Sequence, residues 1–204
     1  NYVLATSDPG SQTPQAPYYS DAQIIDMVNK VKAQKRKVII SLGGQFFHLT
    51  MKTEQDKVNF VNQVEKIVDK YGFEGIDLDL EGSATSADTT LLAQAVNEVV
   101  SHYRNQGKDF LLTMAPEWSY ITPVRYGCGQ WGSGAYENTF YTELATKIGM
   151  ENISYVMPQT YNQGPANGIC GANETKVSPS EGGGMPSFVA AMTWALTTES
   201  GYAA

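Results

Sequence analysis

The sequence contains only two cysteines and two histidines among its 204 residues, so few of the side chains that hold metal ions are present. Cys128 and Cys170 lie in Gly-rich segments, and their spacing matches no zinc-binding motif. His48 and His102 each stand alone in the sequence. We therefore expect no metal site. The spacing leaves open whether the two cysteines form a disulfide or remain free thiols.

Positive charge and long apolar runs are also scarce. Lys and Arg number 14 against 21 Asp and Glu, a formal net charge of −7, which argues against nucleic acid and anionic membranes as partners. No stretch approaches the roughly 18 apolar residues of a membrane span. The first residues, Asn-Tyr-Val-Leu-Ala, lack the basic leader of a signal peptide and are typical of a strand. Composition predicts one globular domain over residues 1–204.

Strands and helices alternate along the chain, and no Gly-x-Gly-x-x-Gly or phosphate-loop pattern opens a helix. This alternation predicts an α/β fold. Because long loops follow the carboxyl ends of strands, we expect a (β/α)8 TIM barrel rather than a doubly wound sheet. The predicted strands are 1–5, 37–42, the acidic run within 74–81, 109–115, 154–159 and 188–196. Helices are predicted after Ser20, between Thr53 and Gly72, over 88–105 and over 138–149.

Local signals place the helix ends and their buried faces. Ser20 with Gln23, and Thr53 with Asp56, predict N-terminal capping boxes, and Gly72 is a helix stop. The predicted apolar faces are Ile24, Ile25, Val28 and Val31 in the first helix, Val61, Val64, Ile67 and Val68 in the second, and Leu92, Ala95, Val96, Val99 and Tyr103 in the third.

Six strands are two fewer than a complete barrel needs, and such barrels usually span about 250 residues. By the family resemblance given below, the strands that are not evident are the first strand and the seventh-strand region, and residues 1–5 correspond to the second strand. Three explanations remain open: the chain is a fragment, the sequence omits segments of the protein, or the barrel is abbreviated.

Three acids occupy alternate positions in the run Gly-Ile-Asp-Leu-Asp-Leu-Glu: Asp77, Asp79 and Glu81. Period two predicts a strand with the acids on one face and aliphatic residues on the other. Unpaired buried carboxylates cost several kcal/mol, so a functional role outweighs the alternative of a solvated edge strand.

The spacing of these acids suits the chemistry of glycosidic bonds. Residues i and i+2 of a strand lie about 6.6 Å apart, so each carboxylate feels the charge of the next. Because crowded carboxylates do not all ionise easily, one stays protonated near neutral pH. Glu81, at the carboxyl end of the strand, is the predicted proton donor. Asp79 is its predicted proton-sharing partner, and Asp77 is the deeper member.

Several motifs together resemble glycoside hydrolase family 18, the chitinases. Residues 74–81 resemble that family's Asp-x-x-Asp-x-Asp-x-Glu signature, with Glu74 in place of the first Asp. The other resemblances, in chain order, are Ser41-Leu42-Gly43-Gly44 (third strand), Thr113-Met114-Ala115-Pro116-Glu117 (fifth strand), Gln159-Thr160-Tyr161-Asn162 (sixth strand) and Ala191-Met192-Thr193-Trp194 (eighth strand).

The resemblance implies a role for each matching residue. Glu81 would be the general acid, Asp79 would orient the substrate's acetamido group, and Asp77 would support Asp79. Tyr161 would donate a hydrogen bond to the acetamido group, and Trp194 would form the apolar floor under the sugar, although both could instead be core aromatics. The other substrate-binding residues implied are Gln159, Met114 and Asn162.

The resemblance implies a secreted, monomeric chitinase that hydrolyses β-1,4-linked N-acetylglucosamine polymers with retention and needs no cofactor. Its substrates would be chitin or N-acetylglucosamine oligosaccharides. Two alternatives remain: an endo-β-N-acetylglucosaminidase acting on N-glycans, and a catalytically silent chitin-binding lectin. Loop aromatics suit a cleft that stacks several sugars, and they are Phe46, Phe47, Trp118, Tyr120 and Trp131.

Overall fold

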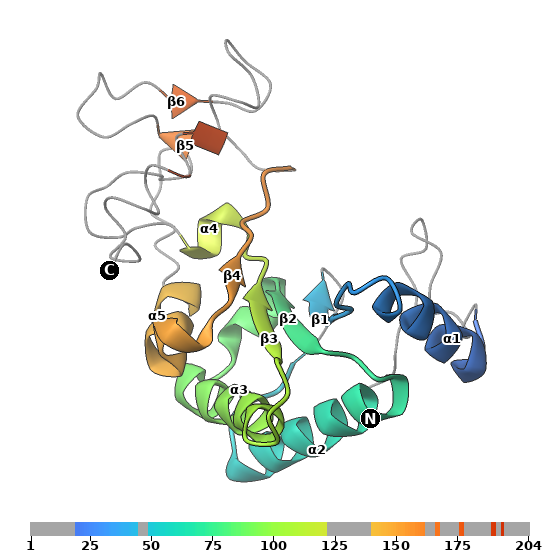
Figure 1. The fold of residues 1–204 in the computed structure, drawn as a ribbon. Helices are drawn as coiled ribbons and strands as arrows, with labels where there is room; N and C mark the ends of the chain where they lie inside the picture. Colours follow the sequence, from blue (N-terminus) through green and yellow to red (C-terminus); the bar gives the residue numbers. More distant parts are fainter. Residues whose placement is uncertain are drawn as a thin grey trace. The chain divides into compact units, whose positions relative to one another are not determined.

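The computed structural model describes residues 19–44, 49–121, 140–161, 166–167, 176–177, 189–190 and 193. The chain divides into two compact units. The first comprises Asn1–Thr113 with Asn152–Tyr155, and the second comprises Met114–Glu151 with Val156–Ala204. Figure 1 labels the helices and strands of both. The predicted strand at 1–5 and both cysteines lie outside the described residues.

A four-stranded sheet follows the chain in the order β1-β2-β3-β4. Its strands are β1 (Ile40–Gly44), β2 (Gly75–Leu80), β3 (Leu111–Met114) and β4 (Tyr155–Val156). Strands β1 and β2 pair in parallel, with Ser41 opposite Asp77 and Gly43 opposite Asp79. The strand–helix alternation that the sequence predicts is confirmed.

The boundaries of three predicted strands are corrected. Strand β1 begins at Ile40 rather than residue 37, and it includes Gly43 and Gly44, because both glycines continue the parallel pairing with β2. Strands β3 and β4 are shorter than the predicted 109–115 and 154–159. Beyond the ends of β3 and β4 the two segments still form a backbone hydrogen bond, in which Gln159 N donates to Pro116 O at 2.9 Å.

Helices α1 (Asp21–Lys32) and α2 (Glu54–Tyr71) begin where the capping signals predict, and α2 also ends at the predicted glycine. Helix α1 has Ser20 as N-cap and Gln23 completes its capping box, while α2 has Thr53 and Asp56 in those roles. Helix α2 ends at Gly72, whose φ of 73° lies in the left-handed region that favours glycine.

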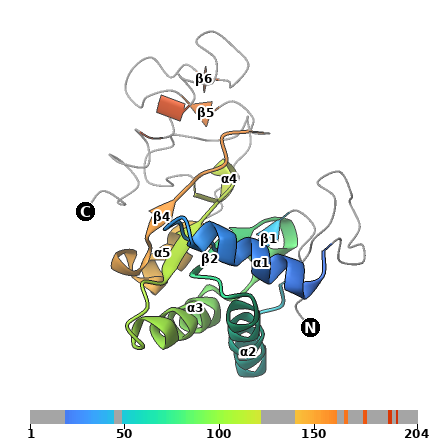
Figure 2. The same cartoon turned by 45° about the vertical axis from the view of Figure 1, so that its right-hand side comes forward.

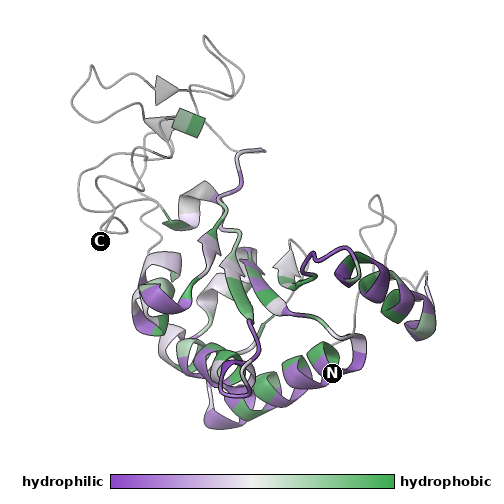
Figure 3. Cartoon of the chain, in the orientation of Figure 1, coloured by the Kyte–Doolittle hydropathy of each residue, from purple (hydrophilic) through white to green (hydrophobic). Residues whose placement is uncertain are grey.

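Helices α2 and α3 (Thr89–Arg104) supply the core of the first unit, and they lie side by side in Figures 1 and 2. In Figure 3 each helix has a hydrophobic stripe and a hydrophilic face. The whole predicted face of α3 is buried (Leu92, Ala95, Val96, Val99 and Tyr103). On α1 the prediction for Val31 is wrong: it is 37% exposed, because Ile24 and Val28 are the residues that pack with Tyr71.

Polar contacts fasten α1 to the end of α2. Lys70 Nζ lies 2.7 Å from Asp21 Oδ2, and the Tyr71 hydroxyl donates to Asp21 Oδ1 at 2.7 Å. The hydrogen bond from Lys70, followed by that from Tyr71, lowers the pKa of Asp21. The bond to Asp21 raises the pKa of Lys70 in turn. Because these groups are exposed, salt weakens their interaction.

We expect an Asp21→Asn variant to melt below the parent protein near neutral pH, with the difference shrinking below about pH 4. The pKa of Asp21 is depressed in the folded state, so its contribution is present above the unfolded value and is lost as pH falls through the folded one. The pKa of Lys70 is raised, so its contribution disappears only at alkaline pH.

Thermal unfolding followed by circular dichroism across this pH range would measure the difference. Asp26→Asn is the matched control, because Asp26 pairs with Lys30 within α1 and joins no second element. A melting difference for Asp21→Asn that stays constant with pH would contradict the prediction.

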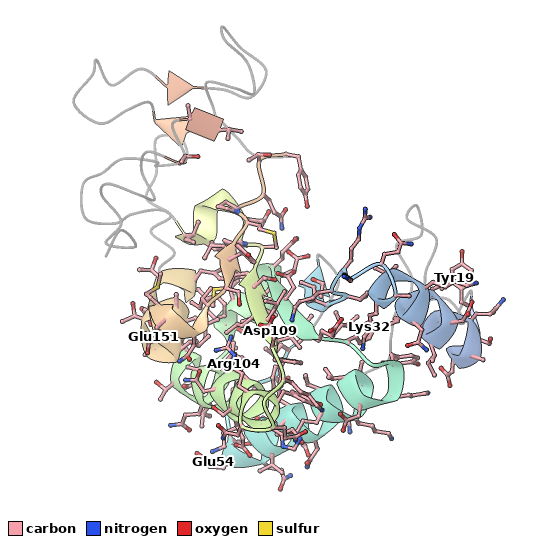
Figure 4. The ribbon with its side chains drawn as sticks, in the orientation of Figure 1. Tyr19, Lys32, Glu54, Arg104, Asp109 and Glu151 are labelled. Carbon is pink, nitrogen blue, oxygen red and sulfur yellow. The ribbon has the colours of Figure 1, made fainter. Side chains whose placement is uncertain are left out.

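The end of α3 is held against the strand that follows it by Arg104. Its Nε donates to Phe110 O at 3.1 Å, and a terminal nitrogen donates to Asn152 O at 3.0 Å. Figure 4 shows the residue on α3. One side chain thereby fixes both the entry into β3 and the segment before β4.

Helix α3 also carries Tyr103. Burial, followed by the hydrogen bond to Asp69, raises the pKa of its hydroxyl group.

The second unit contains α4 (Trp118–Ile121), α5 (Phe140–Ile148) and the antiparallel pair β5 (Ala166–Asn167) and β6 (Lys176–Val177). The predicted strand at 188–196 is wrong where it is described, because Val189, Ala190 and Thr193 are helical. Two consecutive alanines in this segment, the strongest helix formers, account for the difference. No helix among the described residues has the length and hydropathy to cross a membrane.

Candidate active site

Strand β2 carries the three acids on one face, opposite its aliphatic residues. Ile76 and Leu78 are 0% exposed and Leu80 is 1% exposed, so they fill the core. Glu81 directly follows the strand with φ −124° and ψ 162°, an extended conformation that continues the alternation. Asp77, Asp79 and Glu81 therefore lie on the same face. Asp77 is buried at 7% exposure, and the other two are half-buried.

Hydroxyl groups from both neighbouring strands hold Asp77. Ser41 Oγ on β1 donates to Asp77 Oδ2 at 2.8 Å, and Thr113 Oγ1 on β3 donates to Oδ1 at 2.6 Å. Each carboxylate oxygen thus has a hydrogen-bond donor, as a buried anion requires. The three residues belong to the first unit.

Two glycines of β1 make room beside Asp79. Gly43 pairs with Asp79, and a Cβ on Gly43 would overlap the Asp79 carbonyl group. A Cβ on Gly44 would lie 4.0 Å from Asp79 Oδ2, an ordinary contact distance. The Ser-x-Gly-Gly sequence therefore provides a hydroxyl for one acid and close backbone approach for the next.

Three other predicted site residues belong to the second unit. Met114 is fully buried at the end of β3. Gln159 is 7% exposed, and its Nε2 donates to Ala115 O at 3.2 Å. Tyr161 is 58% exposed. Asn162 and Trp194 lie outside the described residues, as do Phe46, Phe47, His48 and Trp131.

The sequence reasoning assigned no role to Thr113, which the structure places in direct contact with Asp77. Thr113 is 2% exposed, between Leu112 and Met114. A hydroxyl within an otherwise apolar buried strand was the signal that could have identified it, because a buried polar group needs a partner. Ser41 and Thr113 both belong to motifs that the sequence shows, but their bonds to Asp77 come from strand pairing.

A cleft of about 350 Å³ opens at the other end of β2, lined in part by Glu74, Lys37 and Asp109. Asp109 forms an ion pair with Lys37, and Glu74 Oε2 is buried without a hydrogen-bond partner. These residues precede β2 and β3, so the cleft is remote from Glu81. Across the part of the chain that the structure describes, no group of three His, Cys, Asp or Glu residues is placed to hold a metal ion.

Comparison with known proteins connects this strand to one family of enzymes. The model for glycosyl hydrolases family 18 matches residues 4–173. A chitinase of Enterococcus faecalis is 35% identical over 147 residues, covering 71% of this chain and 38% of that protein. Exochitinase 1 of Streptomyces olivaceoviridis is 33% identical over 165 residues, covering 74% of this chain and 27% of that protein.

Among solved structures, a putative chitinase A from Streptomyces coelicolor superposes with a TM-score of 0.64 at 25% identity, covering 85% of this chain and 50% of that one. The chain thus spans half or less of the length of these relatives. The fold is that of a (β/α)8 TIM barrel, of which the described strands and helices form a part.

Proposed function

The chain belongs to family 18 of the glycosyl hydrolases, and from this premise we propose that it acts as a chitinase with Glu81 as its general acid. The substrate would be chitin or an N-acetylglucosamine oligosaccharide, cleaved at β-1,4 links with retention at the anomeric carbon. The related proteins' names support the substrate class.

The arrangement around β2 is the observation that carries the proposal. Asp77 is buried and held by two hydroxyls, while Asp79 and Glu81 are half-buried on the same face. Exposure therefore increases along this row of three acids, from the buried, hydrogen-bonded Asp77 to the more accessible Glu81. Catalytic groups of TIM barrels lie at the carboxyl ends of strands, where Glu81 follows β2.

In the first step, Glu81 gives its proton to the leaving glycosidic oxygen as the bond to the anomeric carbon breaks. The carbonyl oxygen of the substrate's own acetamido group attacks that carbon and forms an oxazolinium ion. Asp79 orients the acetamido N–H and compensates the positive charge that develops. Asp77 holds Asp79 in place from deeper in the strand. The substrate supplies the nucleophile, so the step needs no cofactor or metal.

In the second step, Glu81 takes a proton from water, and the water oxygen attacks the anomeric carbon and opens the oxazolinium ring. Two inversions at one carbon give net retention. By the family resemblance, Tyr161 would donate a hydrogen bond to the acetamido group, and Trp194 would form the floor under the sugar. Gln159, Met114 and Asn162 would complete the substrate site.

We further propose that residues 1–204 belong to a single catalytic domain that works outside the cell as a monomer. Its acidic charge of −7 disfavours nucleic acid and anionic membranes as partners. An endo-β-N-acetylglucosaminidase acting on N-glycans would use the same acid and the same acetamido chemistry. A catalytically silent lectin would bind chitin oligomers without cleaving them.

Incubation with N-acetylglucosamine pentamer, with the glucosamine pentamer as control substrate, tests the proposal. We expect shorter oligomers from the first substrate only, because the second lacks the acetamido carbonyl. Nuclear magnetic resonance of the fresh products should show the β anomer. An α product, or equal cleavage of both pentamers, would refute the mechanism. Binding without cleavage would favour the lectin, and release of oligosaccharide from an N-glycoprotein would favour the glycan-cleaving enzyme.

A further inference from the structure

Asp77 is a buried carboxylate with no cation beside it among the described residues. The ion pairs of that part of the chain do not include it, and its two oxygens accept from Ser41 and Thr113. An ionised carboxylate in such a place depends on hydrogen-bond donors for its stability. The two hydroxyls are therefore the groups that compensate its charge.

The hydroxyls of Ser41 and Thr113 differ in whether water could take their place as donors to Asp77. Thr113 is 2% exposed, on β3 within the sheet. Ser41 is exposed, on β1 at one end of the strand order. Water can take the place of a lost donor at Ser41 at little cost, but it has no access at Thr113. Loss of the Thr113 hydroxyl would leave Asp77 Oδ1 without a donor in a dry environment.

We propose that Thr113 is a positioning residue for the reaction, because its hydroxyl holds the Asp77 carboxyl group fixed beside Asp79. This inference rests on the proposed function of Asp77, Asp79 and Glu81. A threonine hydroxyl has one proton to donate, and Thr113 Oγ1 donates it to Asp77 Oδ1 at 2.6 Å. Asp77 held in this way keeps Asp79 in place to orient the acetamido group of the substrate.

Among the described residues, the acids that share a face of β2 with Asp77 are Asp79 and Glu81. The paired strands β1 (Ile-Ser-Leu-Gly-Gly) and β3 (Leu-Leu-Thr-Met) carry no titratable side chain. Helices α2 and α3 contribute apolar residues to the core with the opposite, aliphatic face of β2.

Thr113→Val and Thr113→Ser form a matched pair, because valine keeps the shape without the hydroxyl and serine keeps the hydroxyl. We expect Thr113→Val to lower kcat for the pentamer by about 10-fold, with KM nearly unchanged. Thr113→Ser should recover most of the rate, and Ser41→Ala should lose less than Thr113→Val.

Urea unfolding gives a second readout that needs no activity. Thr113→Val should be less stable than the parent, and Thr113→Ser should recover most of the lost stability, because serine again donates to Asp77 Oδ1. If the parent protein does not cleave chitin oligomers, the proposed function fails while this measurement still tests the Thr113–Asp77 contact.

Equal rates and stabilities for Thr113→Val and the parent would overturn the inference. It would also be overturned if the Val and Ser variants lost activity and stability equally, because that pattern indicates packing alone.

Discussion

Replacement of Glu81 by glutamine is expected to lower kcat for N-acetylglucosamine pentamer by about 100- to 10,000-fold, the usual contribution of a general acid. Glutamine matches glutamate in shape but carries no transferable proton. The leaving oxygen would then depart as an unprotonated alkoxide. Because the change removes an interaction made in the transition state, KM should vary little.

The control for this variant is Glu98→Gln, the same chemical change on the exposed surface of α3. It should leave both kcat and the melting temperature near those of the parent. Glu81→Gln should also melt near the parent, since Glu81 is half-buried beyond the end of β2. Cleavage by Glu81→Gln at the parent rate would assign the acid to another residue.

Replacement of Gly43 by alanine is expected to lower the free energy of unfolding by about 3 kcal/mol or more, from backbone strain and overpacking together. The φ angle of Gly43 is +134°, which side-chain-bearing residues rarely adopt. A Cβ there would overlap the Asp79 carbonyl, which is backbone and has no rotamer to change. Strands β1 and β2 would have to separate where Ser41 meets Asp77.

Gly44→Ala is a close control, because Gly44 also has a positive φ, +86°, but among the described residues its Cβ would meet nothing nearer than Asp79 Oδ2 at 4.0 Å. We expect it to cost only the strain, about 1–2 kcal/mol. Urea denaturation of the two variants would measure the difference, which isolates the overlap with Asp79. Equal losses for the two would show that the close approach of β1 to β2 contributes nothing.

Local signals predicted helix ends well because capping is decided by neighbouring residues. Ser20 with Gln23 and Thr53 with Asp56 form the capping boxes, and Gly72 ends α2 in the left-handed conformation. Each of these contacts joins residues three or four apart, so the necessary information is contained in a short segment. Strand ends were predicted less well, since pairing with a distant segment determines where a strand starts and stops.

The segment at residues 188–196 shows where prediction from local sequence fails. Residues 188–196 have an apolar pattern that suits either a strand or a buried helix, and Val189 and Ala190 are helical. Short apolar runs are ambiguous by periodicity alone. The predicted buried face of α1 was too long, because helical spacing does not show how far the contact with another element extends. Ile24 and Val28 pack with Tyr71, whereas Val31 is 37% exposed.

The sequence by itself determined the acid row, because alternation on a strand places Asp77, Asp79 and Glu81 on one face without reference to any other segment. The tertiary structure alone decided how the row is supported. The pairing of β1, β2 and β3 brings Ser41 and Thr113 to the two oxygens of Asp77. Both are 36 residues away in sequence. Contacts of that separation depend on strand order and register, which no local pattern of residues encodes.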